Sequence, residues 1–287
     1  MTLLRLIRFH QWYKNLLIFL PIIFGKEILN PRPLLLTVLG FAALCLISST
    51  NYIINDIIDR KKDKLHPEKS KRPIASGKFP VTPAIILALI FFLGSITISL
   101  YLSKLFLFSV LGLFFLTQGY TFLLKDEPFV DILTIAVNFV IRAVAGTFVI
   151  VNNGAPYLEI SPWLILCPFF LALFLSTGKR ASELKKLKSD SEKHKKVYSH
   201  YTPEITRSLT IISTALLIMS YSLYSFSAHD NKLLITLPVV LYGILRYYYL
   251  IEQGHKISRK THLVFTDKRL VITMAGFILM LFFIIYP

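Results

Sequence analysis

A run of acidic and amide side chains directly follows an apolar segment. Residues Leu34–Ile54 are largely apolar and lead without a break into Asn55, Asp56, Asp59 and Asp63. On a continuous helix these four side chains fall within roughly 100° of arc. Three carboxylates on one face repel each other at neutral pH unless a cation lies among them, and oxygen ligands favour a hard ion. We therefore expect these four residues to hold Mg²⁺.

The alternative for this cluster is a helix end whose acidic residues simply face water. Acidic residues near a membrane boundary are usually functional, and basic residues flank this cluster in the loop Arg60–Lys78. Pro67 and Pro73 disfavour helix at the residues before them, which predicts an ordered loop folded over the acids. Arg60 and Arg72 are then expected to bind phosphate oxygens with bidentate geometry, and this expectation is strongest for Arg72.

A second polar set follows one face of a later apolar segment. Asp131, Ile135, Asn138 and Arg142 fall within roughly 60° of one another on a helix. Charged groups are costly in lipid and should face the interior of the helix bundle. Asp131 and Arg142 are too far apart for a direct ion pair, so we expect a polar cavity between them, with a buried Arg142 bonded to a helix carbonyl as the alternative.

The N-terminal residues leave two interpretations open. Trp12 and Tyr13 fit an aromatic belt at a membrane boundary, which alone would explain them. Lys14 and Asn15 at the start of an apolar segment could instead face an anionic substrate.

These side chains must be positioned by membrane helices. The 287 residues are 54% hydrophobic, which predicts an all-α polytopic membrane protein. Apolar runs of membrane length predict about nine spans, at 12–28, 33–59, 81–100, 104–124, 128–150, 160–180, 206–227, 232–251 and 269–286.

The basic residues predict an orientation for these spans. A net charge of +16 would suggest nucleic acid in a soluble protein, but here the charge sits in loops between apolar spans, which favours anionic ligands and no nucleic acid. With the N-terminus in the cytosol, the basic loops 60–80, 179–206 and 252–268 are all cytosolic. No cleavable signal peptide is evident. We expect one catalytic domain, residues 1–287, in the inner (plasma) membrane with a cytosolic active site.

On this topology, polar groups from several spans end at one membrane face. The second span ends at the acid cluster, and the fourth, sixth and eighth end at Lys125-Asp126, Lys179-Arg180-Glu183 and Arg246. Their convergence indicates a functional site at the boundary between cytosol and bilayer.

A family resemblance supports this view. The pattern Asn55-Asp56-x-x-Asp59-x-x-x-Asp63, followed by Arg72-Pro73-x-x-Ser76-Gly77, resembles the first signature of the UbiA-type intramembrane prenyltransferase superfamily. Further motifs resemble its decaprenyl-phosphate phosphoribosyltransferase branch: Gln11-Trp12-x-Lys14-Asn15, Asp63-x-x-His66-Pro67-x-Lys69, Leu124-Lys125 with Asp131, Ile141-Arg142-Ala143-x-Ala145-Gly146, Gly178-Lys179-Arg180-x-x-Glu183-Leu184 and Ile244-Leu245-Arg246-Tyr247. The usual second acidic motif is represented only by Asp126, Glu127 and Asp131.

The resemblance implies about nine helices around a central cavity with a Mg²⁺-diphosphate site. It also implies transfer of a 5-phosphoribosyl group from 5-phosphoribosyl diphosphate to a polyprenyl phosphate. The implied catalytic residues are Asp56, Asp59, Asp63 and Asp131. The implied substrate-binding residues are Lys14, Asn15, Asn55, Arg60, Arg72, Lys125, Asn138, Arg142, Lys179, Arg180 and Arg246.

Two other functions stay open from the sequence. A true prenyltransferase would use the same metal site for a prenyl diphosphate and alkylate an aromatic or lipid acceptor. A transporter with a cytosolic cation site would also place polar residues in its spans, although here they gather at one face. The sequence leaves the polyprenyl chain length and the oligomeric state open.

Overall fold

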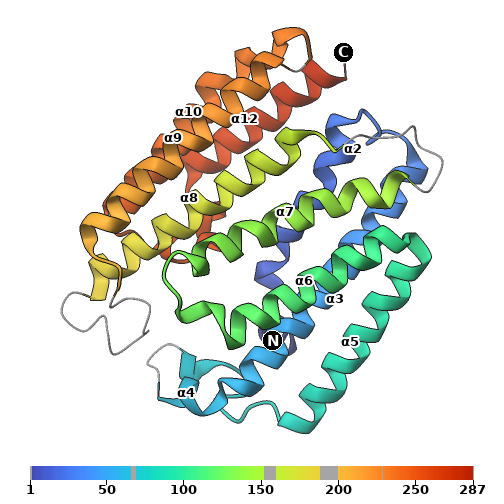
Figure 1. Cartoon of the computed structure of the whole chain (residues 1–287), viewed down its shortest axis with the longest axis vertical. Coiled ribbons are helices and arrows are strands. Elements are labelled where there is room, and N and C mark those ends of the chain that lie inside the picture. The colour runs from blue at the N-terminus through green and yellow to red at the C-terminus, as the bar shows by residue number, and fades with distance from the viewer. Residues whose placement is uncertain (1, 66–68, 152–159, 188–199, 228, 287) are drawn as a thin grey trace. The chain divides into compact units, whose positions relative to one another are not determined.

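All secondary structure elements in the described part of the chain are helices, and it contains no strand (Figure 1). The computed structural model describes residues 2–65, 69–151, 160–187, 200–227 and 229–286. Its helices are α1 (Thr2–Leu6), η1 (Phe9–Phe19), α2 (Leu20–Phe24), α3 (Pro31–Ile58), α4 (Arg60–Lys64), η2 (Lys69–Lys71), α5 (Val81–Leu102), α6 (Lys104–Phe122), η3 (Leu124–Asp126), α7 (Val130–Val151), α8 (Pro162–Leu187), α9 (Pro203–Ser227), η6 (His229–Thr236), α10 (Leu237–Glu252), α11 (Lys256–Arg259), η7 (Thr261–Thr266) and α12 (Lys268–Ile285).

Eight segments of the described chain are helical, long and apolar enough to cross a membrane. They match the second to ninth predicted spans, with ends displaced by a few residues. The all-α polytopic fold predicted from the sequence is thereby confirmed, and the protein is an integral membrane protein. Residues 66–68, among them His66 and Pro67, and residues 188–199 lie outside the described residues.

The first predicted span, 12–28, is built differently from the others. It consists of the 11-residue 3₁₀ helix η1 and the 5-residue helix α2. A 3₁₀ helix rises about 2.0 Å per residue against 1.5 Å for an α-helix, so the two together extend about 30 Å, the thickness of a bilayer core. A ninth crossing of the membrane by this segment stays a prediction.

The chain divides into two compact units. The first contains residues 1–123 and 141–160, and the second contains residues 124–140 and 161–287, so the unit boundary falls within α7. In the first unit, α3 packs against α5, α6 and η1. Its core includes Ile18, Leu44, Phe106 and Val149, all completely buried.

The second unit has its own apolar core. α8 packs along α9, and α10 packs on both of them and on α12. Phe174, Leu217, Tyr247 and Ile251 are among the buried side chains of this core. Each unit thus has an apolar core against which its helices pack.

The end of α3 decides where the acid cluster lies. The α-helix stops at Ile58, and Asp59 (φ −79°, ψ 0°) separates it from α4. The Asp59 N–H still donates to the Asn55 carbonyl and the Asp63 N–H to the Asp59 carbonyl, at 2.9 and 2.8 Å. Because these helix-like bonds continue through the break, Asp63 keeps nearly the position that an uninterrupted helix would give it.

Candidate functional site

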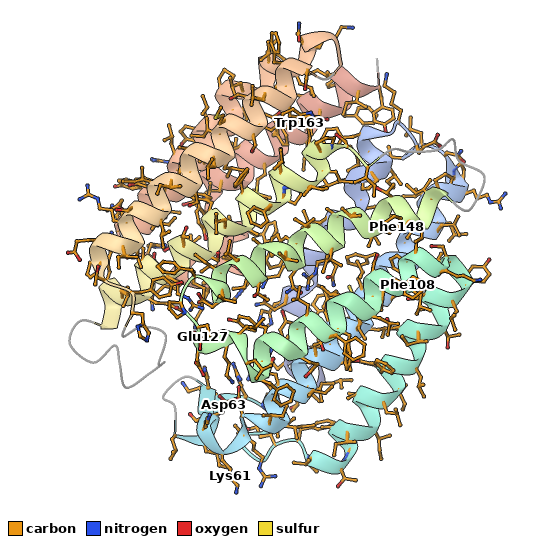
Figure 2. All side chains as sticks on the ribbon, viewed as in Figure 1. Lys61, Asp63, Phe108, Glu127, Phe148 and Trp163 are labelled. Atoms are coloured by element: carbon orange, nitrogen blue, oxygen red, sulfur yellow. The ribbon has the colours of Figure 1, made fainter. Side chains whose placement is uncertain are left out.

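The acid cluster of the first unit is crosslinked by arginines. Arg72 Nη1 donates to Asp63 Oδ2 at 2.6 Å and to Asp56 Oδ1 at 3.1 Å, while Arg8 Nη2 donates to the same Asp56 oxygen at 2.5 Å. Both carboxylates are almost fully buried. Asp63 lies on the opposite side of α4 from the exposed Lys61 (Figure 2). Burial without such partners would be costly for both acids.

The loop after η2 places Arg72. The Arg72 N–H donates to the Lys69 carbonyl, and the Ser76 N–H donates back to the Arg72 carbonyl, each at 2.9 Å. Ile74 and Ala75 are buried, and Ile74 packs in a small core with Leu6 and Ile53. These contacts hold the loop on the first unit and aim the Arg72 guanidinium at the acids.

Arg8 was not singled out from the sequence. Leu6 and Ile7 are buried, and Ser49 Oγ donates to the Ile7 carbonyl at 3.0 Å, which fixes the chain just before Arg8. Arg8 itself has a left-handed backbone (φ 49°), and its guanidinium lies 4.5 Å from the Tyr52 ring centroid. A non-glycine residue in this conformation costs on the order of 1 kcal/mol and is frequent at functional sites.

Burial shifts the titration of the groups around Arg72. The pKa of Asp63 is raised above its ordinary value by burial, although the charges of Arg72 and Lys69 oppose the shift. Burial lowers the pKa of Lys69, and the positive charge of Arg72 lowers it further. The two arginines and Lys69 thus form a cationic edge beside the buried carboxylates.

The side-chain oxygens of the acid cluster suit a magnesium ion that also binds substrate. No three His, Cys, Asp or Glu side chains in the described ranges lie close enough together to hold a metal ion by themselves. Mg²⁺, however, usually takes one or two carboxylates and fills its other positions with water and phosphate oxygens. Asn55 Oδ1, from the residue before Asp56, is buried without a hydrogen-bond partner. It is a further oxygen that could serve as a metal ligand. The residues present therefore fit the expected ion.

A second polar group of the first unit surrounds Asn15. Its Oδ1 accepts from Arg142 Nε at 2.9 Å and from Ser48 Oγ at 3.4 Å, and its Nδ2 donates to Cys45 Sγ at 3.3 Å. Asn15 and Arg142 are both buried. The Asn15 amide thus holds the deep arginine that the sequence placed in the bundle interior.

Asn138 bonds a backbone carbonyl. Its Nδ2 donates to the Thr134 carbonyl of its own helix at 2.9 Å, and residue 138 belongs to the second unit whereas residue 142 belongs to the first. A role for Arg142 in contacting substrate phosphate or in organising polar groups such as Asn138 stays a prediction.

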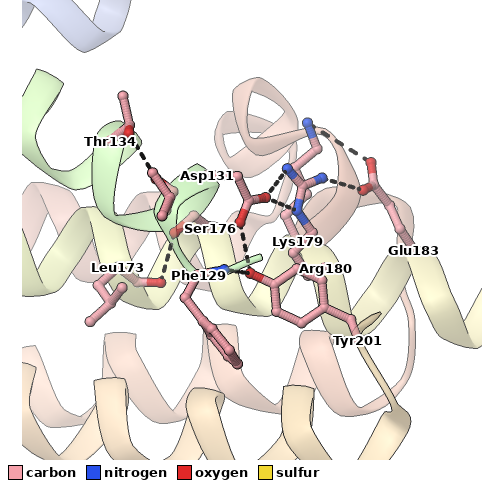
Figure 3. A network of polar contacts seen from close by, with 10 residues as sticks. Phe129, Asp131, Thr134, Leu173, Ser176, Lys179, Arg180, Glu183 and Tyr201 are labelled. Atoms are coloured by element: carbon pink, nitrogen blue, oxygen red, sulfur yellow. Dashed lines mark hydrogen bonds and ion pairs between the residues drawn. The ribbon is translucent and has the colours of Figure 1, made fainter. Parts of the chain in front are cut away.

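The second unit holds Asp131 in a network of hydrogen bonds (Figure 3). Arg180 donates to Asp131 Oδ2 through Nε at 3.0 Å and through Nη2 at 2.8 Å, and Tyr201 Oη donates to Asp131 Oδ1 at 2.7 Å. The Tyr201 oxygen accepts from the Phe129 N–H at 2.8 Å. Because three donors engage its two oxygens, Asp131 is placed to orient Arg180.

Arg180 also reaches Glu183, and Tyr201 completes the network. Arg180 Nη1 lies 3.3 Å from Glu183 Oε2, and the exposed Lys179 lies 3.8 Å from Glu183 Oε1. Burial and the bond to Asp131 raise the pKa of Tyr201, which keeps its hydroxyl protonated as a donor. Tyr201 was missed from the sequence, where only its place just before a span and Pro203 marked it.

The remaining predicted residues are less buried than Asp56 and Asp63. Arg60 is exposed, Lys14 and Lys125 are half-buried, and Asp59 is half-buried at the end of α3. Arg246 Nη2 donates to Asp267 Oδ2 at 2.8 Å in the second unit, where Asp267 also caps α12. The structure therefore gives Arg246 a carboxylate partner.

Comparisons with known proteins identify relatives of this chain. A model described as the UbiA prenyltransferase family matches residues 18–270. A decaprenyl-phosphate phosphoribosyltransferase of Corynebacterium glutamicum is 32% identical over 80% of this chain and 69% of that protein. The protein of the same name from Mycolicibacterium smegmatis is 32% identical over 82% of this chain and 73% of its own length.

Solved structures share the fold. A UbiA homologue from Archaeoglobus fulgidus bound to DMAPP and Mg²⁺ has a TM-score of 0.73 and 22% identity, with 99% of each chain covered. An apo UbiA homologue from Aeropyrum pernix K1 has a TM-score of 0.72 and 13% identity, over 94% of this chain and 97% of that one. With a family match over most of its length and the same fold, this integral membrane protein belongs to the UbiA prenyltransferase family.

Proposed function

We propose that the protein transfers a 5-phosphoribosyl group from 5-phosphoribosyl diphosphate to a polyprenyl phosphate. The observation that carries the proposal is the similarity over about four-fifths of the chain to two proteins named decaprenyl-phosphate phosphoribosyltransferase. The buried acid–arginine cluster supports it, because it offers both oxygen ligands for a cation and guanidinium groups for phosphate.

The reaction is a displacement at the anomeric carbon of the ribose. A phosphate oxygen of the polyprenyl phosphate forms the new bond to this carbon, and the bond to the diphosphate breaks with its electron pair leaving on the diphosphate. The acceptor oxygen is already anionic, so no strong general base is needed. When bound, Mg²⁺ neutralises charge on the leaving diphosphate.

The residues proposed for the cation are Asn55, Asp56, Asp59 and Asp63. Arg72 is proposed to exchange its carboxylate partners for phosphate oxygens of the donor, which match the planar guanidinium equally well. Arg8, bonded to the same Asp56 oxygen, is available for the same exchange. Further candidates for substrate contacts are Lys14, Asn15, Arg60, Lys125, Asn138, Arg142, Lys179, Arg180 and Arg246.

Asp131 is proposed to serve the reaction by holding Arg180, with both carboxylate oxygens engaged.

The proposed setting is the plasma membrane, with a single catalytic domain, residues 1–287, whose basic loops face the cytosol. A water-soluble donor and a lipid acceptor require a site at that boundary.

The second candidate is transfer of a prenyl group from a prenyl diphosphate to an aromatic or lipid acceptor. It is favoured by the shared fold with the Archaeoglobus fulgidus homologue, which was solved with DMAPP or with GPP and Mg²⁺. Family membership favours either enzyme over the transporter.

Purified protein in lipid nanodiscs separates the two reactions. With Mg²⁺, labelled 5-phosphoribosyl diphosphate and decaprenyl phosphate, we expect a labelled lipid and released diphosphate, both lost when Mg²⁺ is chelated. Labelled geranyl diphosphate with an aromatic acceptor should give no product. Product only in the second reaction would replace the proposed function with prenyl transfer.

A further inference from the structure

Two amide side chains of the first unit face each other one helical turn from the acid cluster. Gln118 Nε2 on α6 donates to Asn51 Oδ1 on α3 at 2.5 Å. Asn51 is 3% exposed and Gln118 is half-buried. Both belong to helices long enough to cross a membrane, where polar groups without partners cost several kcal/mol each.

This single bond leaves part of the pair unused. Asn51 Nδ2 carries two N–H groups and Gln118 Oε1 is an acceptor, and the described part of the chain gives neither atom a partner. Asn51 Nδ2 and Gln118 Oε1 are both accessible, because neither belongs to the fully buried side-chain atoms that lack a hydrogen bond. A donor and an acceptor therefore stand open side by side on α3 and α6.

The chemistry of the open groups defines their ligand. A hydroxyl group both donates and accepts, so it satisfies an amide N–H and an amide carbonyl together. A phosphate oxygen only accepts and would be repelled by the Gln118 carbonyl. A hydrocarbon chain would leave both groups unsatisfied.

The position of the pair fits a ligand that also reaches the acid cluster. Asn51 precedes Asn55 by four residues on α3, which is about 6 Å along the axis on the same helix face. In a pentosyl diphosphate, the hydroxyl-bearing ring is bonded directly to the diphosphate. A ring whose diphosphate lies at Asn55 and Asp56 would bring its hydroxyls to the amide pair.

We propose that Asn51 and Gln118 form a subsite for ring hydroxyl groups and thereby select a sugar diphosphate over a prenyl diphosphate. The inference rests on the proposed function and adds the residues that determine donor class. A site built to bond a hydroxyl rejects an analogue without it far more strongly than an apolar pocket rejects an added group.

The test compares binding of three ligands to nanodisc-embedded protein in Mg²⁺ by calorimetry. In Gln118→Met, which keeps the side-chain volume, the Kd for 5-phosphoribosyl diphosphate should rise about tenfold, as expected for a lost hydrogen bond with its partner left unsatisfied. The Kd for inorganic diphosphate, which has no ring, should stay unchanged, and geranyl diphosphate should bind more tightly. Gln253→Met makes the same change at an exposed position and should alter none of the three.

Equal weakening of all ligands, or no change in any, would overturn the subsite. A donor lacking the ring 2-hydroxyl gives a second measurement that needs no variant: the wild-type protein should bind it at least several-fold more weakly than the normal donor, and equal affinity counts against the subsite. Wild-type protein that binds neither sugar donor but binds geranyl diphosphate would instead refute the proposed function, and with it the subsite.

Discussion

At the scale of single residues, Asp56 is the group on which the first unit's polar contacts converge. Its Oδ1 atom accepts from both Arg8 and Arg72, and its carboxylate is buried. The single negative charge of Asp56 is therefore shared between the guanidinium groups of Arg8 and Arg72. In the proposed reaction the same carboxylate also holds the cation, which makes its charge more important than its shape.

Replacing Asp56 by Asn tests that charge. We expect Asp56→Asn to lower turnover by at least about 100-fold, because the metal's charge stabilisation is worth several kcal/mol. Activity at limiting and at saturating Mg²⁺ is measured together with the melting temperature. Glu252→Gln, an exposed acid-to-amide change, is the control, and near-normal turnover in Asp56→Asn at limiting Mg²⁺ would exclude it as a ligand.

Tyr201 tests the network of the second unit. In Tyr201→Phe, Asp131 Oδ1 and the Phe129 N–H both lose their partner, which should cost about 1–3 kcal/mol of stability. If the tyrosine acts through Arg180, the effects of Tyr201→Phe and Arg180→Lys on the KM for the donor should be non-additive by about 0.5–3 kcal/mol. A double variant whose effects simply add would show that Tyr201 serves stability alone.

At the scale of elements, η1 shows how a helix type sets its contacts. In a 3₁₀ helix residues three apart lie on one face, so Trp12, Asn15 and Ile18 point the same way. Trp12 Nε1 donates to Ser49 Oγ at 3.2 Å, Asn15 bonds Cys45, and Ile18 is fully buried. Trp12 is thus bonded to α3, a contact that the aromatic-belt interpretation did not include.

Gly146 allows η1 to lie close to α7. A Cβ at this position would clash with the Ile18 carbonyl oxygen, a contact with backbone that no rotamer change relieves. We expect Gly146→Ala to destabilise the protein by about 1–3 kcal/mol, measured as a lower melting temperature in detergent. Gly112→Ala, where nothing lies within 4 Å, should be neutral, and equal effects of the two would contradict the close approach.

The start of α12 carries a pH-dependent contact. Burial alone would raise the pKa of Asp267, but the bonds from Arg246 and from the Leu270 N–H outweigh it and hold the pKa below its ordinary value. A lowered native pKa means that this stabilisation is present above the unfolded-state pKa and is lost as pH falls through the native one. It should therefore be complete at neutral pH and absent in strong acid.

Asp267→Asn isolates this charge, since Asn keeps an oxygen to cap the helix. The variant should melt below wild type at pH 7 by an amount corresponding to about 1 kcal/mol, and the two curves should converge in acid. Asp267→Ala, which also loses the cap, should stay below wild type at every pH. A difference in Asp267→Asn that does not depend on pH would rule out the ion pair as its source.

At the scale of the whole molecule, the charge distribution predicts which side of the membrane each loop faces. Introduced cysteines test this in a background of Cys45→Ser and Cys167→Ser. Lys78→Cys, in an exposed basic loop, should react with a membrane-impermeant reagent only from the cytosolic side, and Lys232→Cys, also exposed, only from the opposite side. The reverse pattern would move the proposed site out of the cytosol.

The sequence by itself determined the spans and the acid motif. Apolar runs of membrane length need no tertiary information, because a lipid environment demands helices wherever the chain is continuously apolar. Eight predicted spans therefore agree closely with the helices. The spacing of Asp56, Asp59 and Asp63 predicted a shared face, and the structure joins Asp56 and Asp63 through Arg72. The family resemblance rested on these local patterns and was confirmed by the match over residues 18–270.

Only the tertiary structure decided which side chains complete each polar group. Arg8 lies 48 residues from Asp56, Arg142 lies 127 from Asn15, and Tyr201 lies 70 from Asp131. Such pairings depend on how helices pack, and no periodicity in the sequence encodes them. The same holds for η1: a longer α-helix would satisfy its apolar pattern equally well, so neither its 3₁₀ geometry nor its close approach to Gly146 can be read from that pattern.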